Sequence, residues 1–99
     1  MPVGVQLDFP GVTFEKYDEV VETMGYLAGG AGPPGMLFHW VTKTDAGTRV
    51  IDVWDTRDGF EAFAADKILP AFREGGVLNP PTIQFYEVHK YLVGSRWRH

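Results

Sequence analysis

The segment MLFHWVTK, residues 36 to 43, decides the fold of this 99-residue chain together with RVIDVWD, residues 49 to 55. Both segments are rich in β-branched and aromatic residues, which favour β-strands. The sequence Asp45-Ala46-Gly47 stands between them and is typical of a tight turn. The pattern therefore predicts a β-hairpin with strands at 36–43 and 48–55.

The segments on either side of the hairpin alternate between strand and helix patterns. Residues 3–9 place apolar side chains at every second position, as a half-buried strand does. Thr13 is a preferred N-cap, and apolar residues at helical spacing predict an amphipathic helix to about Leu27. A second helix is expected after Thr56, and Pro70 is expected to kink it or to end its first segment.

A last strand is expected at 82–92, in the sequence TIQFYEVHKYL. The resulting order, β-α-β-β-α-β, is that of a ferredoxin-like α+β fold, in which two helices cover one face of an antiparallel sheet. Residues 1–92 are predicted to form a single domain, with residues 93–99 as a C-terminal tail.

The hairpin strands are apolar on both faces. Simple alternation places Met36, Phe38 and Trp40 on one face and Leu37 and Val41 on the other. A sheet with one solvated face shows polar residues there, so both faces are expected to be covered. The chain has no third layer, and a homodimer through the open sheet face is the predicted solution.

Composition excludes several classes of function. The absence of cysteine removes thiolate nucleophiles and zinc–thiolate sites, and a net charge of -4 argues against a nucleic-acid surface. No apolar run reaches the length of a membrane span and no signal peptide is recognisable, so a cytoplasmic protein without membrane contact is expected. No metal-ligand spacing, Walker loop or dinucleotide fingerprint is present, so no metal and no cofactor are predicted.

One ionisable residue stands inside each strand of the hairpin. His39 is a candidate general base because histidine titrates near neutral pH. Asp52 is a candidate partner of His39 or of a polar substrate group, since a buried carboxylate is costly unless it is paired. The structural alternatives are a satisfied buried histidine and a carboxylate that accepts from a tryptophan N–H, an arginine or a backbone N–H.

The turn decides whether His39 and Asp52 meet. A three-residue loop at 45–47, with its glycine in the left-handed conformation, pairs Thr44 with Thr48 and is favoured by the sequence. His39 and Asp52 then point to opposite faces. If the loop is only Ala46-Gly47, the register shifts by one residue and the two fall on the same face, one diagonal apart, so a His–Asp dyad is the less favoured arrangement.

The favoured register also gathers aromatic side chains around Asp52. Such a box holds a flat ligand by stacking, or else forms a dimer interface or ordinary core. Two residues of the last strand are added as candidates for the same site, although a charged face near the chain end is usually solvated. The predicted substrate-binding residues are Phe38, Trp40, Trp54, Tyr86 and His89.

Residues 28–35, AGGAGPPG, exclude regular structure. The plain interpretation is a surface connection between the first helix and the hairpin. The alternative is a mobile flap over a cavity, because flexible glycine-rich loops often serve as lids.

From Val3 to Leu92 the chain resembles the dimeric α/β-barrel superfamily, which includes small antibiotic-biosynthesis-monooxygenase-like proteins. The resemblance rests on the element order and on the segments LFHWV, RVIDVWDTRDGFEAF, KILPAF and FYEVHKYL. It implies two sheets packed together in a dimer and a pocket in each subunit between sheet and helices. Members include cofactor-free monooxygenases of polyketide phenols, isomerases, decarboxylases and haem-degrading enzymes.

The haem-degrading members supply an axial histidine from the second helix, and this sequence has no histidine between Asp55 and Gly76. The leading hypothesis is therefore a cofactor-free enzyme or binder of a hydrophobic aromatic or polyketide-like compound. As an enzyme it would be a monooxygenase, isomerase or cyclase that begins with proton abstraction. The alternative is a non-catalytic structural or regulatory homodimer that uses the same residues as core and interface.

Overall fold

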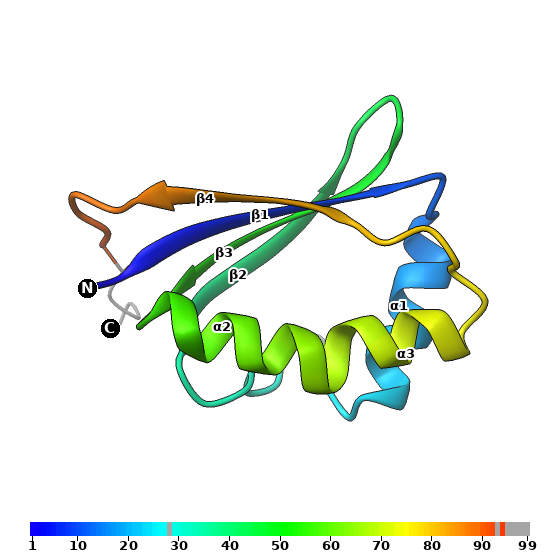
Figure 1. The fold of residues 1–99 in the computed structure, drawn as a ribbon, viewed down its shortest axis with the longest axis horizontal. Helices are drawn as coiled ribbons and strands as arrows, with labels where there is room; N and C mark the ends of the chain where they lie inside the picture. Colours follow the sequence, from blue (N-terminus) through cyan, green and yellow to red (C-terminus); the bar gives the residue numbers. More distant parts are fainter. Residues whose placement is uncertain (28, 93, 95–99) are drawn as a thin grey trace, which may run out of the picture.

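The chain folds into a four-stranded antiparallel sheet that is covered on one side by helices (Figure 1). The computed structural model describes residues 1–27, 29–92 and 94. The strands stand in the order β2-β3-β1-β4. Their bounds are β1 Val3–Pro10, β2 Met36–Lys43, β3 Gly47–Trp54 and β4 Thr82–Glu87, and those of the helices are α1 Phe14–Thr23, α2 Arg57–Phe63, η1 Ala64–Ile68 and α3 Leu69–Glu74. The predicted ferredoxin-like α+β fold is confirmed.

The predicted helix starts are also confirmed. The Thr13 hydroxyl accepts from the Lys16 backbone N–H at 3.1 Å, and the Thr56 hydroxyl accepts from that of Gly59 at 3.0 Å. Each cap satisfies an N–H that the first helical turn leaves without a partner. Within the part of the chain that the structure describes, no helix is long and apolar enough to cross a membrane.

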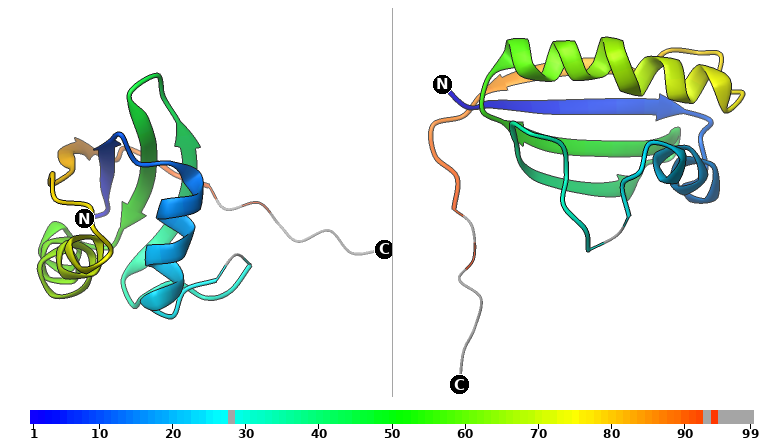
Figure 2. Two further views of the ribbon diagram at one scale, coloured as in Figure 1. Left: turned by 90° about the vertical axis from the view of Figure 1, so that its right-hand side faces the viewer. Right: turned by 90° about the horizontal axis from the view of Figure 1, so that it is seen from below.

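The second helical segment runs without a break from Arg57 to Glu74 (Figures 1 and 2). Pro70 does not end it, although a proline lacks the N–H that continues a helix. The π-helical turn η1 directly precedes Pro70, and there the Leu69 N–H donates to the Ala64 carbonyl five residues back. The irregularity expected at Pro70 therefore takes the form of a wider helical turn.

Two predicted elements end earlier than expected. Helix α1 stops at Thr23 because Gly25 adopts a φ of 92°, and the Tyr26 N–H turns back to the Val21 carbonyl. Strand β4 stops at Glu87, which pairs with Val3. Since Val3 is the first residue of β1, the last strand has no partner beyond this point.

The hairpin register differs from both predicted alternatives. Thr44 and Gly47 exchange backbone hydrogen bonds around the two-residue loop Asp45-Ala46, so His39 lies directly opposite Asp52 and not one diagonal away. Gly47 is not left-handed; it begins β3, where a Cβ atom would collide with the backbone carbonyl of Phe9. The glycine therefore serves the close approach of β1 and not the turn, which is why the three-residue loop was wrong.

An irregularity at Leu37 also changes which side chains share a face. Met36 pairs with Trp54 while Phe38 pairs with Val53, which leaves Leu37 as an extra residue in β2. Met36 therefore turns toward the helices, and Phe38 and the residues after it keep strict alternation. The predicted grouping of Met36 with Phe38 on one face is wrong for this reason.

The core lies between the inner face of the sheet and the helices. Phe9 stacks on Phe72 with ring centroids 4.5 Å apart, and Trp54 meets Phe60 edge to face at 5.6 Å. Trp54 is 1% exposed. The predicted tail at 93–99, apart from Gly94, lies outside the described residues.

Candidate active site

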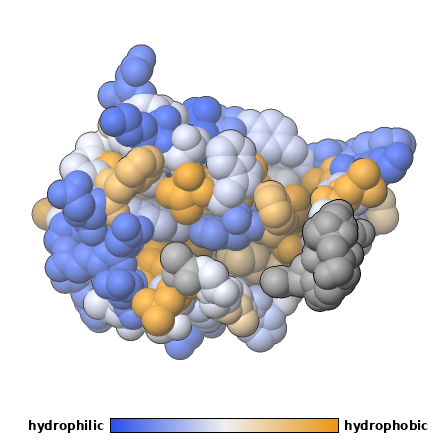
Figure 3. Space-filling model, turned by 180° about the vertical axis from the view of Figure 1, so that it is seen from behind, coloured by the Kyte–Doolittle hydropathy of each residue, from blue (hydrophilic) through white to orange (hydrophobic). Residues whose placement is uncertain are grey.

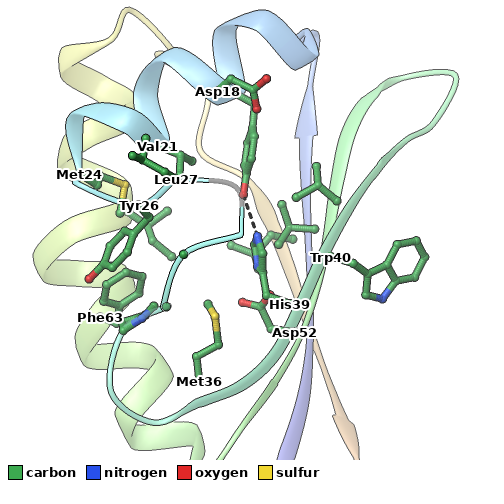
Figure 4. A pocket seen from close by; sticks show the side chains of 18 of the residues that line it. Asp18, Val21, Met24, Tyr26, Leu27, Met36, His39, Trp40, Asp52 and Phe63 are labelled. Carbon is green, nitrogen blue, oxygen red and sulfur yellow. Dashed lines mark hydrogen bonds and ion pairs between the residues drawn. The ribbon is translucent and has the colours of Figure 1, made fainter. Parts of the chain in front are cut away.

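A cavity of about 640 Å³ opens between the inner face of β2 and β3, helix α1 and the glycine-rich loop. Figure 4 shows His39 and Asp52 on the strand side, facing Met24, Tyr26 and Phe63 across the space. Its volume falls within the range of small-molecule sites, and most of its lining is apolar. The cavity is therefore large enough for a flat aromatic compound.

Three side chains form a hydrogen-bonded row in the wall of this cavity. His39 Nδ1 lies 2.6 Å from Asp52 Oδ1, and His39 Nε2 lies 3.3 Å from the Tyr17 hydroxyl (Figure 4). A carboxylate only accepts, so Nδ1 carries a ring proton, and in the neutral ring Nε2 is then the acceptor of the Tyr17 hydrogen bond. The row thus brings the second ring nitrogen of His39 to the cavity wall beside the Tyr17 hydroxyl.

Asp52 owes its position to the sheet and to Trp54. It is 3% exposed, and its second oxygen accepts from the Trp54 Nε1–H at 3.0 Å. Both carboxylate oxygens are therefore paired, as burial of a charge requires. The sequence offered two alternative roles for Asp52, partner of His39 and acceptor of a tryptophan N–H, and in the structure Asp52 makes both contacts.

Tyr17 reaches the row from α1 and is buried. Burial raises the pKa of its hydroxyl, and the negative charges of Asp52 and Asp18 raise it further. The hydroxyl consequently stays protonated and acts as a hydrogen-bond donor. With Nε2 as the acceptor, Tyr17 donates to His39 in the free protein.

The glycine-rich loop forms part of the cavity wall. Gly29, Gly30, Gly32 and Pro33 line it, and the loop returns to the sheet at Gly35, which has a φ of 92° and packs against the Trp54 ring. The structure thus places this segment where a flap over a cavity would lie. Ala28 lies outside the described residues.

Charge around the cavity has one sign. Its wall includes the carboxylates of Asp18, Glu22 and Asp52, and among the residues that the structure describes it holds neither lysine nor arginine. Seen from behind, from the side of the β2 edge, apolar surface occupies the middle of the molecule and hydrophilic side chains border it (Figure 3). No group of three potential metal ligands is found within the described ranges. These features fit an uncharged, largely apolar ligand.

Three of the predicted ligand-binding residues, Trp54, Tyr86 and His89, are not among the residues that line the cavity. Phe38 and Trp40 do contribute to its lining, but they are 50% and 47% exposed on the outer side of β2, and Figure 4 shows the Trp40 indole turned away from His39. Tyr86 lies on the same outer face, where its hydroxyl donates to Gln84 Oε1 at 2.7 Å. His89 is exposed beyond the end of β4. Because the register differs, the predicted box divides, and only Trp54 shares the inner face with Asp52.

The sequence patterns did not point to Tyr17, Tyr26 or Met36 as cavity residues. Tyr17 was read as one apolar position in the stripe of α1. The usable signal was its hydroxyl, since a buried tyrosine oxygen needs a partner and the inner sheet face offers His39. Met36 was misassigned because the extra residue at Leu37 leaves no mark in the pattern.

Comparisons with known proteins find similarity in structure and none in sequence families. No family model matches the sequence, and no curated protein matches it. A protein of unknown function from Nitrosomonas europaea has a TM-score of 0.60 at 16% identity, covering 96% of this chain and 94% of that one.

Two further solved structures are named as oxygenases. SnoaB, a cofactor-independent oxygenase from Streptomyces nogalater, has a TM-score of 0.58 at 20% identity over 92% of this chain and 95% of that one. A monooxygenase from the gene ActVA-Orf6 of Streptomyces coelicolor, in complex with nanaomycin D, has a TM-score of 0.50 at 23% identity over 95% and 92%. Sequence identities at this level show a shared fold, and the reaction has to be inferred from the residues of the site. The chain has the ferredoxin-like fold of the antibiotic-biosynthesis-monooxygenase-like proteins.

Proposed function

We propose that the protein is a cofactor-independent enzyme that removes a proton from a flat, uncharged, polyketide-like compound, and that His39 is the general base. The observation that carries the proposal is the paired imidazole in the cavity wall. Asp52 holds Nδ1 at 2.6 Å and leaves Nε2 on the cavity side. Each catalytic role in this scheme belongs to a residue of the inner sheet face.

The first step is transfer of an acidic C–H or phenolic O–H proton to His39 Nε2. Asp52 favours the imidazolium that forms, because its carboxylate lies against Nδ1–H. Trp54 keeps that carboxylate in place through Nε1–H. Asp52 and Trp54 are therefore positioning residues, and His39 is the catalytic residue.

The substrate anion then has two possible fates. In the oxygenase reaction it adds dioxygen as co-substrate, the peroxide anion takes the proton back from the His39 imidazolium to form a hydroperoxide, and loss of water gives a quinone or ketone. In the isomerase or cyclase reaction it is protonated again at another atom by the imidazolium. The two neighbours named as oxygenases support the first outcome.

The proposal includes a homodimer formed by residues 1–92 through the outer sheet face. Half-exposed aromatic side chains, Phe38, Trp40 and Tyr86, lie on that face. Covering them removes apolar surface from water, as stable dimer interfaces do. In such a dimer these residues hold the subunits together and the substrate stays on the inner face.

Oxygen uptake with anthrone as the test substrate examines the reaction directly. Anthrone is a flat tricyclic ketone with an acidic methylene group, and its conversion consumes one dioxygen and yields anthraquinone and water. His39→Ala is expected to lower kcat about 10²–10⁴-fold, the usual contribution of a general base. His89→Ala is the matched control, because it removes an exposed histidine outside the cavity.

Binding of nanaomycin D and of anthrone, followed by thermal shift, accompanies the assay. Stabilisation by either compound together with the loss in His39→Ala supports the proposal. Equal oxygen uptake by the wild type and His39→Ala contradicts it. If neither compound stabilises or reacts, the cavity does not take flat polycyclic ketones and the proposal fails at its substrate class.

A further inference from the structure

We propose that Tyr17 is a second catalytic residue, whose hydroxyl donates a hydrogen bond to the carbonyl oxygen of the substrate, and that the substrate is therefore an enolisable ketone. The inference rests on the proposed function, since it assigns a partner to the base His39. It adds a residue and a functional group that neither the sequence pattern nor the shared fold supplies.

Removing a proton next to a carbonyl places negative charge on the oxygen. An enzyme stabilises that charge with donors aimed at the oxygen before the reaction begins. In many sites a lysine, an arginine or a metal ion supplies this stabilisation. The described part of this cavity wall holds no lysine, arginine, serine, threonine, asparagine or glutamine.

Few side chains on the wall can donate a hydrogen bond. Apart from the base itself they are Tyr17, Tyr26 and Trp40, and the Trp40 indole is turned away from His39 (Figure 4). Tyr26 packs edge to face on Phe63, across the cavity from His39. Tyr17 alone of the three is hydrogen-bonded to the base, with its oxygen 3.3 Å from Nε2.

That distance fits the two ends of an enolisable group. A carbonyl oxygen and its α-carbon are separated by a single intervening carbon. A ketone in the cavity can therefore offer its α-proton to Nε2 and its oxygen to the Tyr17 hydroxyl at once. A neutral imidazole nitrogen accepts one hydrogen bond, so the hydroxyl must leave Nε2 when the substrate proton arrives. Rotation about the tyrosine C–O bond turns its proton to the substrate oxygen.

Electrostatics keeps Tyr17 in the donor form. Burial and the charges of Asp52 and Asp18 all raise the pKa of its hydroxyl, so Tyr17 does not compete with His39 as a base. The same negative charges repel a carboxylated substrate. The combined chemistry selects an uncharged ketone.

Carbonyl vibrational spectroscopy of bound α-tetralone, recorded without oxygen, tests the contact. This ketone carries the α-hydrogen that displaces the Tyr17 hydroxyl from Nε2, and without oxygen it is not oxidised. In the wild type the carbonyl stretch of the ¹³C-labelled ketone is expected at lower frequency than in hexane. Tyr17→Phe is expected to abolish the shift, whereas the matched variant Tyr26→Phe, which removes a hydroxyl from the same cavity, retains it.

Each other outcome rejects the inference. A shift that persists in Tyr17→Phe assigns the donor to another group, such as the backbone amides of the glycine-rich loop. An unshifted carbonyl in the wild type, or no binding by calorimetry, shows that Tyr17 does not receive a ketone. His39→Ala separates this inference from the proposed function: it is expected to lose oxygen uptake and to keep the α-tetralone shift, because the Tyr17 hydroxyl then has no imidazole to donate to.

Discussion

The two faces of the sheet each carry an aspartate paired with a basic side chain, and the two pairs have different surroundings. On the inner face, Asp52 is 3% exposed, meets His39 at 2.6 Å and adjoins the cavity. On the outer face, Asp8 meets the Arg49 Nε–H at 2.6 Å, and both side chains remain partly exposed. The contrast lies in the aspartates: Asp52 is buried beneath a His39 side chain that is 35% exposed, whereas Asp8 is itself 27% exposed and water screens its charge.

The aromatic side chains divide in the same way. Trp54 is enclosed in the core and supports Asp52, while Trp40 stands half-exposed on the outer face. Because successive residues of a strand alternate between faces, one hairpin presents different side chains to the cavity and to the outer surface. The inner residues build the proposed active site, and the outer residues are free for the proposed subunit contact.

The largest expected effect is on Trp54. Trp54→Ala removes a fully enclosed ring and is expected to lower the free energy of unfolding by about 3–5 kcal/mol. Trp40→Ala is the matched change on the outer face, and its effect is expected only through dimerisation. Denaturant titration at two protein concentrations separates them: the loss in Trp54→Ala is independent of concentration, and equal, concentration-independent losses in both variants would contradict the assignment of faces.

The next effect is on the two aspartates. Asp52→Ala leaves the buried Trp54 Nε1–H without an acceptor, at an expected cost of about 1–3 kcal/mol in the free energy of unfolding. Asp8→Ala leaves Arg49 at the surface, where water solvates it, and a smaller loss is expected. Chemical denaturation of the two variants under one set of conditions measures the difference. A larger loss in Asp8→Ala would reverse the interpretation of the faces.

A change on the outer face tests the proposed dimer. Trp40→Lys places a charge where the model of subunit contact needs an apolar surface, and a rise in the dimer dissociation constant of about tenfold or more is expected, equivalent to about 1.4 kcal/mol. Sedimentation equilibrium measures it. Lys43→Ala, a change at the far end of β2, serves as a control for altered charge. A wild type that sediments as a monomer at high concentration contradicts the dimer itself.

The smallest effect concerns pH and the outer pair. The hydrogen bond from Arg49 lowers the pKa of the Asp8 carboxyl in the folded protein. A lowered folded-state pKa adds stability at pH values above the ordinary aspartate range, and this share disappears as the pH falls through the folded-state pKa. Asp8→Asn is therefore expected to weaken the fall of Tm between neutral and strongly acidic pH. An unchanged slope would show that the pair adds nothing to stability.

Local patterns were sufficient to predict the element order and the helix caps. Thr13 and Thr56 cap their helices through contacts three residues away, which a short window of sequence contains. The hairpin register was not predictable in this way. Gly47 is required by the neighbouring strand at Phe9, a contact between residues distant in sequence, so its presence in the turn region misled the prediction.

The candidate site was predictable only in part. His39 and Asp52 were conspicuous because ionisable residues are unusual inside apolar strands, and the structure brings them together. Phe38 and Trp40 were expected on the same face as Asp52, and the observed register places these two side chains on the outer side of β2. The contact of Tyr17 with His39 was not predictable, because a helical pattern shows which positions face inward but not which polar atom lies opposite them.

The central claim is that the paired imidazole of His39 removes a proton from a ligand in the cavity. Hydrogen–deuterium exchange at the α-carbon of α-tetralone, followed by NMR in D₂O without oxygen, tests it most directly because it needs no later step. The wild type is expected to accelerate exchange, and His39→Ala and Asp52→Asn to reduce that acceleration by about 100-fold or more. Asp52 accepts from His39 on one oxygen and from Trp54 on the other, and in Asp52→Asn one of these two positions becomes an NH₂ donor, so the imidazole loses its fixed tautomer when that position faces Nδ1. Exchange no faster than in buffer, or equally fast in His39→Ala, would contradict the claim.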